Sequence, residues 1–205
     1  MGGSITENIH SVGHDNTDLG RWVWQLFKGW DGIATRCYTA YCPVKAHSLS
    51  TTYMQHWRYF RSHGRSLLEQ EVCPRDAFLR DLSLELHSQI TAGERLIVMM
   101  DGNCDMRGGP LWQMMTDMGL RDAILARHGT TGAPATYILG QHPIDAIWVS
   151  LDIPVVSAGW LGGDFAIGDH RVGFVDIPFQ ALIGEEKLKV AHPQARRLNC
   201  GLPKA

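Results

Sequence analysis

Alternating apolar and polar positions near the start of the chain predict a pair of strands. Over 22–27, two tryptophans and a leucine fall on one face of an extended chain, and valine, glutamine and phenylalanine fall on the other. Turn residues follow at 28–32, and a second extended run at 33–41 stops before a proline, so the pair predicts a β-hairpin. Residues 1–20 are polar and contain glycine, and they predict an irregular arm.

Helical spacing dominates the middle of the chain. Apolar residues recur every three or four positions over 50–71. A second such run steps by four between Pro74 and Gly93. The continuous apolar run at 96–100 predicts a strand buried on both faces, and the methionine-rich stretch at 111–118 predicts a short helix.

Extended runs return toward the C-terminus. Three are clear, at 135–139, 144–150 and 171–177, and a weaker one lies at 155–160. Helices lie between groups of strands, while hairpin-like strands adjoin each other. The order therefore predicts an α+β fold, or a mixed sandwich with helices outside, and not a strict alternation of strand and helix.

Composition and charge narrow the class of protein. With 205 residues, 44% hydrophobic and 20% charged, the chain is typical of one globular domain. No apolar run reaches the roughly 18 residues of a membrane span, so no membrane contact is expected. A net charge of −2 excludes binding to nucleic acid by bulk charge, but it allows a nuclease whose positive charge is local or supplied by a metal. The five scattered cysteines and the lack of a signal-peptide pattern predict an intracellular location.

Candidate chemistry begins where the buried strand at 96–100 ends. The next residues are Asp101, Gly102 and Asn103. Residues two apart on an extended chain point the same way, so Asp101 and Asn103 should project together. Gly102 would let the chain bend and bring a ligand near the backbone. An ordinary turn after a strand is the alternative.

Two further acidic sites lie in the later strands. Asp145 shares a strand face with apolar residues, where a carboxylate is costly unless it is paired or bound to a metal. Asp169 and His170 precede the last extended run, and a bend at Gly168 would bring both into one cleft. A carboxylate beside an imidazole can bind a metal while the imidazole donates to an anion.

The order of these motifs resembles that of the endonuclease/exonuclease/phosphatase family, which includes deoxyribonuclease I and the abasic-site endonucleases. The match covers about residues 20–178, with glycine where the family has serine in the last motif. The matching segments, in order, are Tyr41-Cys42-Pro43, Asp101-Gly102-Asn103, Thr136, Ile144-Asp145 and Gly168-Asp169-His170. Within the family, the stretches LGRWVWQ and ATRCYTAYCP look most like the nuclease domains of retroelement polyproteins.

The resemblance implies two mixed β-sheets packed face to face with flanking helices, a four-layer α/β/β/α sandwich. The family's domain opens with two strands, the second of which ends in a metal-binding glutamate. Nothing in this chain matches them except an isolated Glu7, so the first strands are expected to be missing. The expected division is an N-terminal arm at 1–20, the family domain at 21–184 and a tail or linker at 185–205.

The resemblance also implies roles for individual residues. Asp101 would orient or deprotonate the attacking water, and Asn103 would hold the phosphate. Asp169 would bind a divalent metal together with Asp101 and Asn103, and such oxygen ligands suit Mg²⁺ or Mn²⁺ rather than zinc. His170 would donate to the scissile phosphate as its charge grows, and Asp145 would orient that imidazole.

A tyrosine and several basic residues complete the expected site. By the same resemblance, Tyr41 would contact or protonate near the leaving oxygen. Lys45, His47, Arg107 and Arg171 are candidates for contact with phosphates of the nucleic acid, with an ordinary solvated surface role as the alternative.

The leading hypothesis is a divalent-metal-dependent phosphodiesterase acting on nucleic acid, with a DNA endonuclease favoured. One alternative is a truncated, weakly active or inactive remnant that binds nucleic acid or assembles with a partner, and another is a phosphatase acting on a small phosphoester. An uncovered sheet edge left by missing strands would drive association. A homo-oligomer is therefore expected, in the simplest case a dimer formed through residues 1–20 and the hairpin at 22–41.

Overall fold

The computed structural model describes residues 5–46, 48–63, 72–131, 133–165 and 168–184. Its strands are β1 (Ile9–His14), β2 (Trp22–Lys28), β3 (Ala34–Tyr41), β4 (Arg95–Asp101), β5 (Leu120–Asp122), β6 (Asp145–Ser150), β7 (Ser157–Trp160) and β8 (Gly173–Asp176). Its α-helices are α1 (Thr52–Ser62), α2 (Pro74–Thr91), α3 (Gly109–Asp117), α4 (Ala123–His128) and α5 (Phe179–Ile183). Short 3₁₀ turns are η1 (Ile5–Asn8), η2 (Trp30–Gly32) and η3 (Gly163–Phe165).

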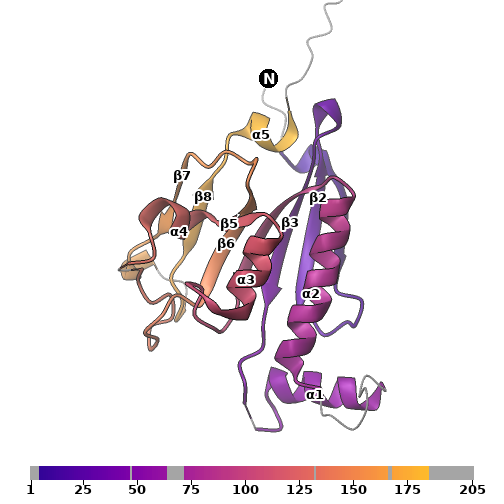
Figure 1. The fold of residues 1–205 in the computed structure, drawn as a ribbon, viewed down its shortest axis with the longest axis vertical. Helices are drawn as coiled ribbons and strands as arrows, with labels where there is room; N and C mark the ends of the chain where they lie inside the picture. The colour runs from indigo at the N-terminus through magenta and orange to yellow at the C-terminus, as the bar shows by residue number, and fades with distance from the viewer. Residues whose placement is uncertain (1–4, 47, 64–71, 132, 166–167, 185–205) are drawn as a thin grey trace, which may run out of the picture.

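The strands form two sheets. One has six strands in the order β1-β2-β3-β4-β6-β5, and β7 and β8 form a second, antiparallel pair. Within the large sheet β3 and β4 run parallel, while β2 with β3 and β4 with β6 run antiparallel. Figure 1 shows α2 and α3 across one face of the large sheet, with β7, β8 and α4 beside it. This is the α+β fold with two packed sheets that the sequence predicted.

The period of two along β4 explains why both faces of the large sheet are covered. Leu96, Val98 and Met100 point to one side, where they pack with Phe78 and other buried residues of α2. Ile97 points to the other side and belongs to a second core shared with α4 and β7. The apolar run at 96–100 is therefore a strand covered on both faces along most of its length, as predicted.

The hairpin and the long second helix are also confirmed, since β2 pairs with β3 in continuous register and α2 begins at Pro74. Pro74 favours a helix start because its missing N–H is not needed in the first turn. The prediction of an irregular arm at 1–20 was wrong in part, because Ile9–His14 form β1 on the edge of the large sheet. Most of its side chains are exposed, so no apolar period marks it, and main-chain bonds to β2 hold it.

Between residues 123 and 139 the structure differs from the prediction in two ways. The expected strand at 135–139 is a turn, with only a bridge from Tyr137 to His170, and its Ile138 and Leu139 are exposed. The helix α4 was not predicted, although Asp122 gives the signal. Its carboxylate accepts from the backbone N–H groups of Ile124 and Leu125, as an N-cap does. The expected tail at 185–205 lies outside the described residues.

Candidate active site

Three strand ends place three polar side chains in a row. Tyr41 at the end of β3 pairs in register with Asp101 at the end of β4, and Asp101 pairs with Asp145 at the start of β6. Neighbours in register on adjacent strands point to the same face of a sheet. These three residues share the parity of Ile97, so they face the second sheet and line one groove of about 380 Å³.

His170 completes the cluster from a different part of the chain. Its Nδ1 lies 2.9 Å from Oδ2 of Asp145. One ligand atom each from Asp101, Asp145 and His170 can be chosen so that all three lie within 4.8 Å of one another. Because Nδ1 is engaged by Asp145, Nε2 is the ring nitrogen left for a ligand. The predicted convergence of these three residues is therefore present in the structure.

The electrostatics of the cluster favour a positive charge at its centre. Burial raises the pKa of Asp101 above its ordinary value, and the charge of Asp145 raises it further. Burial alone would lower the pKa of His170, but the hydrogen bond and charge of Asp145 outweigh it, and the net shift is upward. Two carboxylates so close together repel each other, and a proton, the neighbouring imidazolium or a metal ion would relieve that repulsion.

Asn103 is held next to Asp101 by the backbone. Its N–H donates to Oδ1 of Asp101 at 3.1 Å, and its side-chain amide donates to the carbonyl of Cys42 at 2.9 Å. In the turn after β4, the backbone takes the left-handed conformation at Asn103, with φ 48°, and not at Gly102. Asparagine tolerates this conformation. Gly102 serves packing, because a Cβ there would lie 1.9 Å from the Met106 methyl. Approach of a ligand to the backbone at Gly102 stays a prediction.

Thr136 fixes the geometry of the Asp145–His170 pair. The side chain is fully buried, and its hydroxyl oxygen accepts from the backbone N–H groups of Ile144 at 2.9 Å and Asp145 at 3.1 Å. Its carbonyl accepts from the N–H of Arg171, the residue after His170, at 2.7 Å. One residue thus ties the start of β6 to the segment that carries the imidazole.

Arg75, at the first turn of α2, is a positioning residue that the sequence did not reveal. Its guanidinium donates to the carbonyl of Pro43 at 3.0 Å and to that of Gly102 at 3.1 Å. These two carbonyls lie just after Tyr41 and Asp101, so one side chain links the C-terminal end of β3 to that of β4. A helical arginine carries no motif that would single it out.

The remaining expected residues lie at different distances from the cluster. Asp169 is exposed and lines an adjoining hollow of about 150 Å³ with His170 and Arg171, but it is not among the three clustered ligands. Arg171 also lines the groove of Tyr41, Asp101 and Asp145, the candidate catalytic groove, and its Nε donates to the carbonyl of Ala135. Metal binding by Asp169 and by Asn103 stays a prediction.

Three other basic residues were expected to contact phosphate. Arg107 is engaged by Asp105, with bonds of 2.8 Å and 2.6 Å, and it also contacts His142. Lys45 is exposed, and His47 lies outside the described residues. A phosphate contact by any of them stays a prediction.

The fold and the cluster can be set against solved structures. The 3′ phosphatase NExo from Neisseria, solved with a product DNA hairpin, is 15% identical over 82% of this chain and 71% of its own, with a TM-score of 0.55. The 3′-5′ exonuclease NExo from Neisseria meningitidis gives the same identity and coverage with a TM-score of 0.54. The human nocturnin catalytic domain with bound sulfate is 20% identical over 75% of this chain, with a TM-score of 0.50. The chain has the fold of the endonuclease/exonuclease/phosphatase family.

The chain matches only part of the length of these solved structures. The chain spans half of the nocturnin domain and 71% of NExo. The endonuclease domain of TRAS1, a telomere-specific non-LTR retrotransposon, is 14% identical with a TM-score of 0.49, so the finer likeness to retroelement nucleases stays a prediction. No protein-family model and no curated protein matches the sequence. In the described part of the chain, no helix has the length and apolar character needed to cross a bilayer.

Proposed function

We propose that this chain is a divalent-metal-dependent phosphodiesterase that hydrolyses nucleic acid, with DNA as the favoured substrate. The observation that carries the proposal is the cluster of Asp101, Asp145 and His170 within 4.8 Å, at a groove that Tyr41 and Arg171 also line. Phosphodiester hydrolysis needs an activated water and groups that neutralise charge on the phosphate oxygens. This cluster offers a carboxylate for the first task and cationic groups for the second.

The donor set fits a hard divalent cation. Ligands of one ion at 2.0–2.6 Å lie at most about 4–5 Å from each other, which matches the span of the cluster. Asp101 and Asp145 would hold Mg²⁺ or Mn²⁺ through carboxylate oxygens. The ion would neutralise phosphate charge and lower the pKa of a bound water.

The protein's own groups have defined tasks in this proposal. Asp145 keeps His170 oriented and protonated, so that Nε2 can donate to a phosphate oxygen. Asp101 would accept the proton of the attacking water. Tyr41 lines the same groove, where its hydroxyl would contact the leaving oxygen, while Arg171 adds positive charge. The product DNA hairpin solved with NExo supports the choice of DNA.

Plasmid nicking tests the proposal directly. Supercoiled plasmid and a single-stranded oligonucleotide are incubated with the purified chain in Mg²⁺, in Mn²⁺ and in EDTA. We expect metal-dependent cleavage that His170→Ala lowers by about 10²–10⁴-fold without loss of folding. Lys28→Gln is the surface control. Lys28 is exposed and pairs with Ala34, at the end of the β2–β3 hairpin away from Tyr41.

Four results would contradict the proposal. Cleavage that persists in EDTA, or in His170→Ala at the wild-type rate, would show that the nicking comes from elsewhere. Release of phosphate from a small phosphoester without cleavage of either DNA would favour a phosphatase. Binding without any hydrolysis would favour an inactive remnant.

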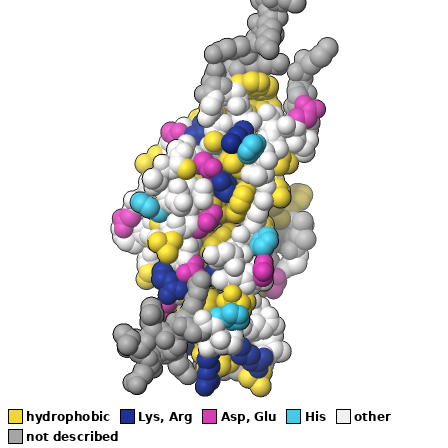
Figure 2. Space-filling view, turned by 90° about the vertical axis from the view of Figure 1, so that its right-hand side faces the viewer, with side chains coloured by type: hydrophobic (Ala, Val, Ile, Leu, Met, Phe, Trp, Pro, Cys, Tyr) yellow, Lys and Arg dark blue, Asp and Glu magenta, His cyan; other side chains and the backbone are white. Residues whose placement is uncertain are grey.

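We also propose self-association through the N-terminal segment and the hairpin that the sequence predicted, but across a face of the sheet and not along the edge of β2. β1 pairs with the edge of β2, so that edge is already covered. Apolar side chains remain exposed on the face of the sheet next to it, where Val12, Val23 and Met99 line a groove of about 780 Å³. Figure 2 shows apolar side chains reaching the surface along the middle of one side of the molecule. Light scattering tests for a dimer, and a monodisperse monomer at tens of micromolar contradicts it.

A further inference from the structure

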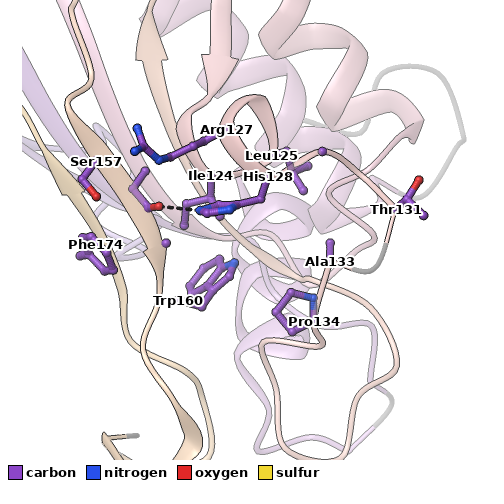
Figure 3. Close-up of a pocket in the computed structure, with 13 residues that line it drawn as sticks. Ile124, Leu125, Arg127, His128, Thr131, Ala133, Pro134, Ser157, Trp160 and Phe174 are labelled. Carbon is purple, nitrogen blue, oxygen red and sulfur yellow. Dashed lines mark hydrogen bonds between the residues drawn. The ribbon is translucent and has the colours of Figure 1, made fainter.

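A second cavity adjoins the candidate catalytic groove. It measures about 610 Å³ and lies between α4, the loop that follows α4, and the β7–β8 sheet. Figure 3 shows the ring of Trp160 in its middle, with Pro134 on one side and Phe174 on the other. Trp160 also lines the groove of Asp101 and Asp145, so the two cavities share this residue. The volume of the cavity beside α4 lies within the range of small-molecule sites.

The walls of this cavity are fixed by packing within the chain. A Cβ on Gly173 would lie 2.6 Å from the Trp160 ring, so only glycine lets the indole rest against β8. A Cβ on Gly159 would lie 3.2 Å from the Phe174 ring. His128 is anchored by its Nε2 contact of 2.8 Å with the carbonyl of Ala158, drawn as a dashed line in Figure 3. The aromatic surface is therefore formed before any ligand binds.

The polar groups of the cavity select the ligand. Arg127 holds the carbonyl of Val156 at 2.7 Å through one nitrogen, and within the described residues no carboxylate pairs with it. The indole N–H of Trp160 meets no acceptor in the described part of the chain. No Asp or Glu is among the described lining residues. An aromatic wall with a cation and an N–H donor suits a flat ring rich in acceptors that carries a phosphate.

We propose that this cavity binds one unpaired nucleobase of the substrate, stacked against Trp160, while the adjacent phosphate lies in the candidate catalytic groove. The proposal rests on the proposed function and extends it by naming the substrate class, which is single-stranded or locally unpaired nucleic acid. A paired base cannot enter, because its edge and both faces are occupied in the duplex.

An abasic scan tests the proposal. Binding of a fluorescent single-stranded oligonucleotide is measured by anisotropy in Ca²⁺, with each nucleotide in turn replaced by an abasic unit. In the wild type we expect one position, next to the cleaved phosphate, where loss of the base weakens binding by about 5- to 150-fold. Trp160→Ala should abolish this dependence and Trp160→Phe should keep most of it. Arg127→Gln should weaken binding more than the control Lys28→Gln.

The outcomes separate this inference from the proposed function. A flat scan in the wild type, or the same base dependence in Trp160→Ala, overturns the base site. Bis(p-nitrophenyl) phosphate has no nucleobase, so its metal-dependent hydrolysis tests the phosphodiesterase alone. Circular dichroism shows whether Trp160→Ala is folded. If it is not, the two other variants decide. The base site is overturned if Trp160→Phe loses the position-specific dependence, or if Arg127→Gln weakens binding no more than Lys28→Gln does.

Discussion

The replacement Asp101→Asn should stabilise the metal-free protein while removing its activity. Asp101 and Asp145 carry ligand oxygens within 4.8 Å of each other. At an effective dielectric constant of about 20, two negative charges at that distance repel by about 3.5 kcal/mol. A protonated His170 at a similar distance offsets much of this repulsion. Burial of Asp101 then decides the sign, because burial is the largest cause of its raised pKa.

The expected gain in EDTA is about 1 kcal/mol, which corresponds to a rise in melting temperature of about 2–4 °C for a domain of this size. The asparagine oxygen can still accept from the N–H of Asn103, so the local turn is kept. A ligand that binds only the folded state at one hundred times its Kd stabilises by about 2.7 kcal/mol. The wild type should gain this from Mg²⁺ and Asp101→Asn much less, so their order should reverse.

Thermal unfolding followed by circular dichroism, with and without Mg²⁺, measures both effects. Hydrolysis of plasmid and of bis(p-nitrophenyl) phosphate measures the loss of activity. Asp152→Asn is the matched control, because Asp152 is an exposed carboxylate outside the groove. An Asp101→Asn variant that melts below the wild type in EDTA would refute the reasoning, since it would show that the carboxylate stabilises the fold. Equal stabilisation of both proteins by Mg²⁺ would refute the metal site.

Two further predictions concern buried groups. Thr136→Val leaves the N–H groups of Ile144 and Asp145 without their acceptor. We expect the free energy of unfolding to fall by about 1–3 kcal/mol and the rate of hydrolysis to fall with it. Thr136→Ser should restore both. Burial raises the pKa of Asp122 to about 6, so its ionised form destabilises the fold above pH 6, and this penalty disappears as the pH falls from 6 to 4. Asp122→Asn keeps the acceptor for the helix N-cap and should raise the free energy of unfolding at pH 7.5 by up to about 3 kcal/mol, and with it the melting temperature, with no gain at pH 4. A lower melting temperature at pH 7.5 contradicts this.

Local chemistry made the main strands predictable. The apolar run before Asp101 could only be a buried strand, and the turn residues after Phe27 implied a hairpin. Burial on one or both faces leaves such a period in the sequence. β1 leaves none, because most of its side chains are exposed and its bonds are made by the main chain. Edge strands of this kind become visible only when their partner is known.

The candidate site was predictable as a set of residues but not as a geometry. The order of motifs named Asp101, Asp145 and His170, and the structure brings them together. The row from Tyr41 to Asp145 depends on strand register, which the sequence does not encode locally. Arg107 was expected at the phosphate, a contact that stays a prediction, and in the structure Asp105, two residues before it, accepts from its Nε and one terminal nitrogen. Competition between near neighbours of this kind is decided by side-chain conformation.

The charge balance of the groove connects stability to function. Asp101 and Asp145 lie side by side in register, Asp169 is next to His170 in the chain, and among the described residues only the His170 ring bonds to a carboxylate of the cluster, an interaction that raises its pKa. Without a further positive charge this arrangement is under repulsion, which Thr136 and Arg75 resist by fixing the backbone on either side. A rigid frame around like charges cannot relax them apart, so the energy falls either when Asp101 takes up a proton, as its raised pKa indicates, or when a cation binds. The same repulsion that lowers stability in EDTA therefore becomes affinity for a metal ion, and both should vanish together in Asp101→Asn.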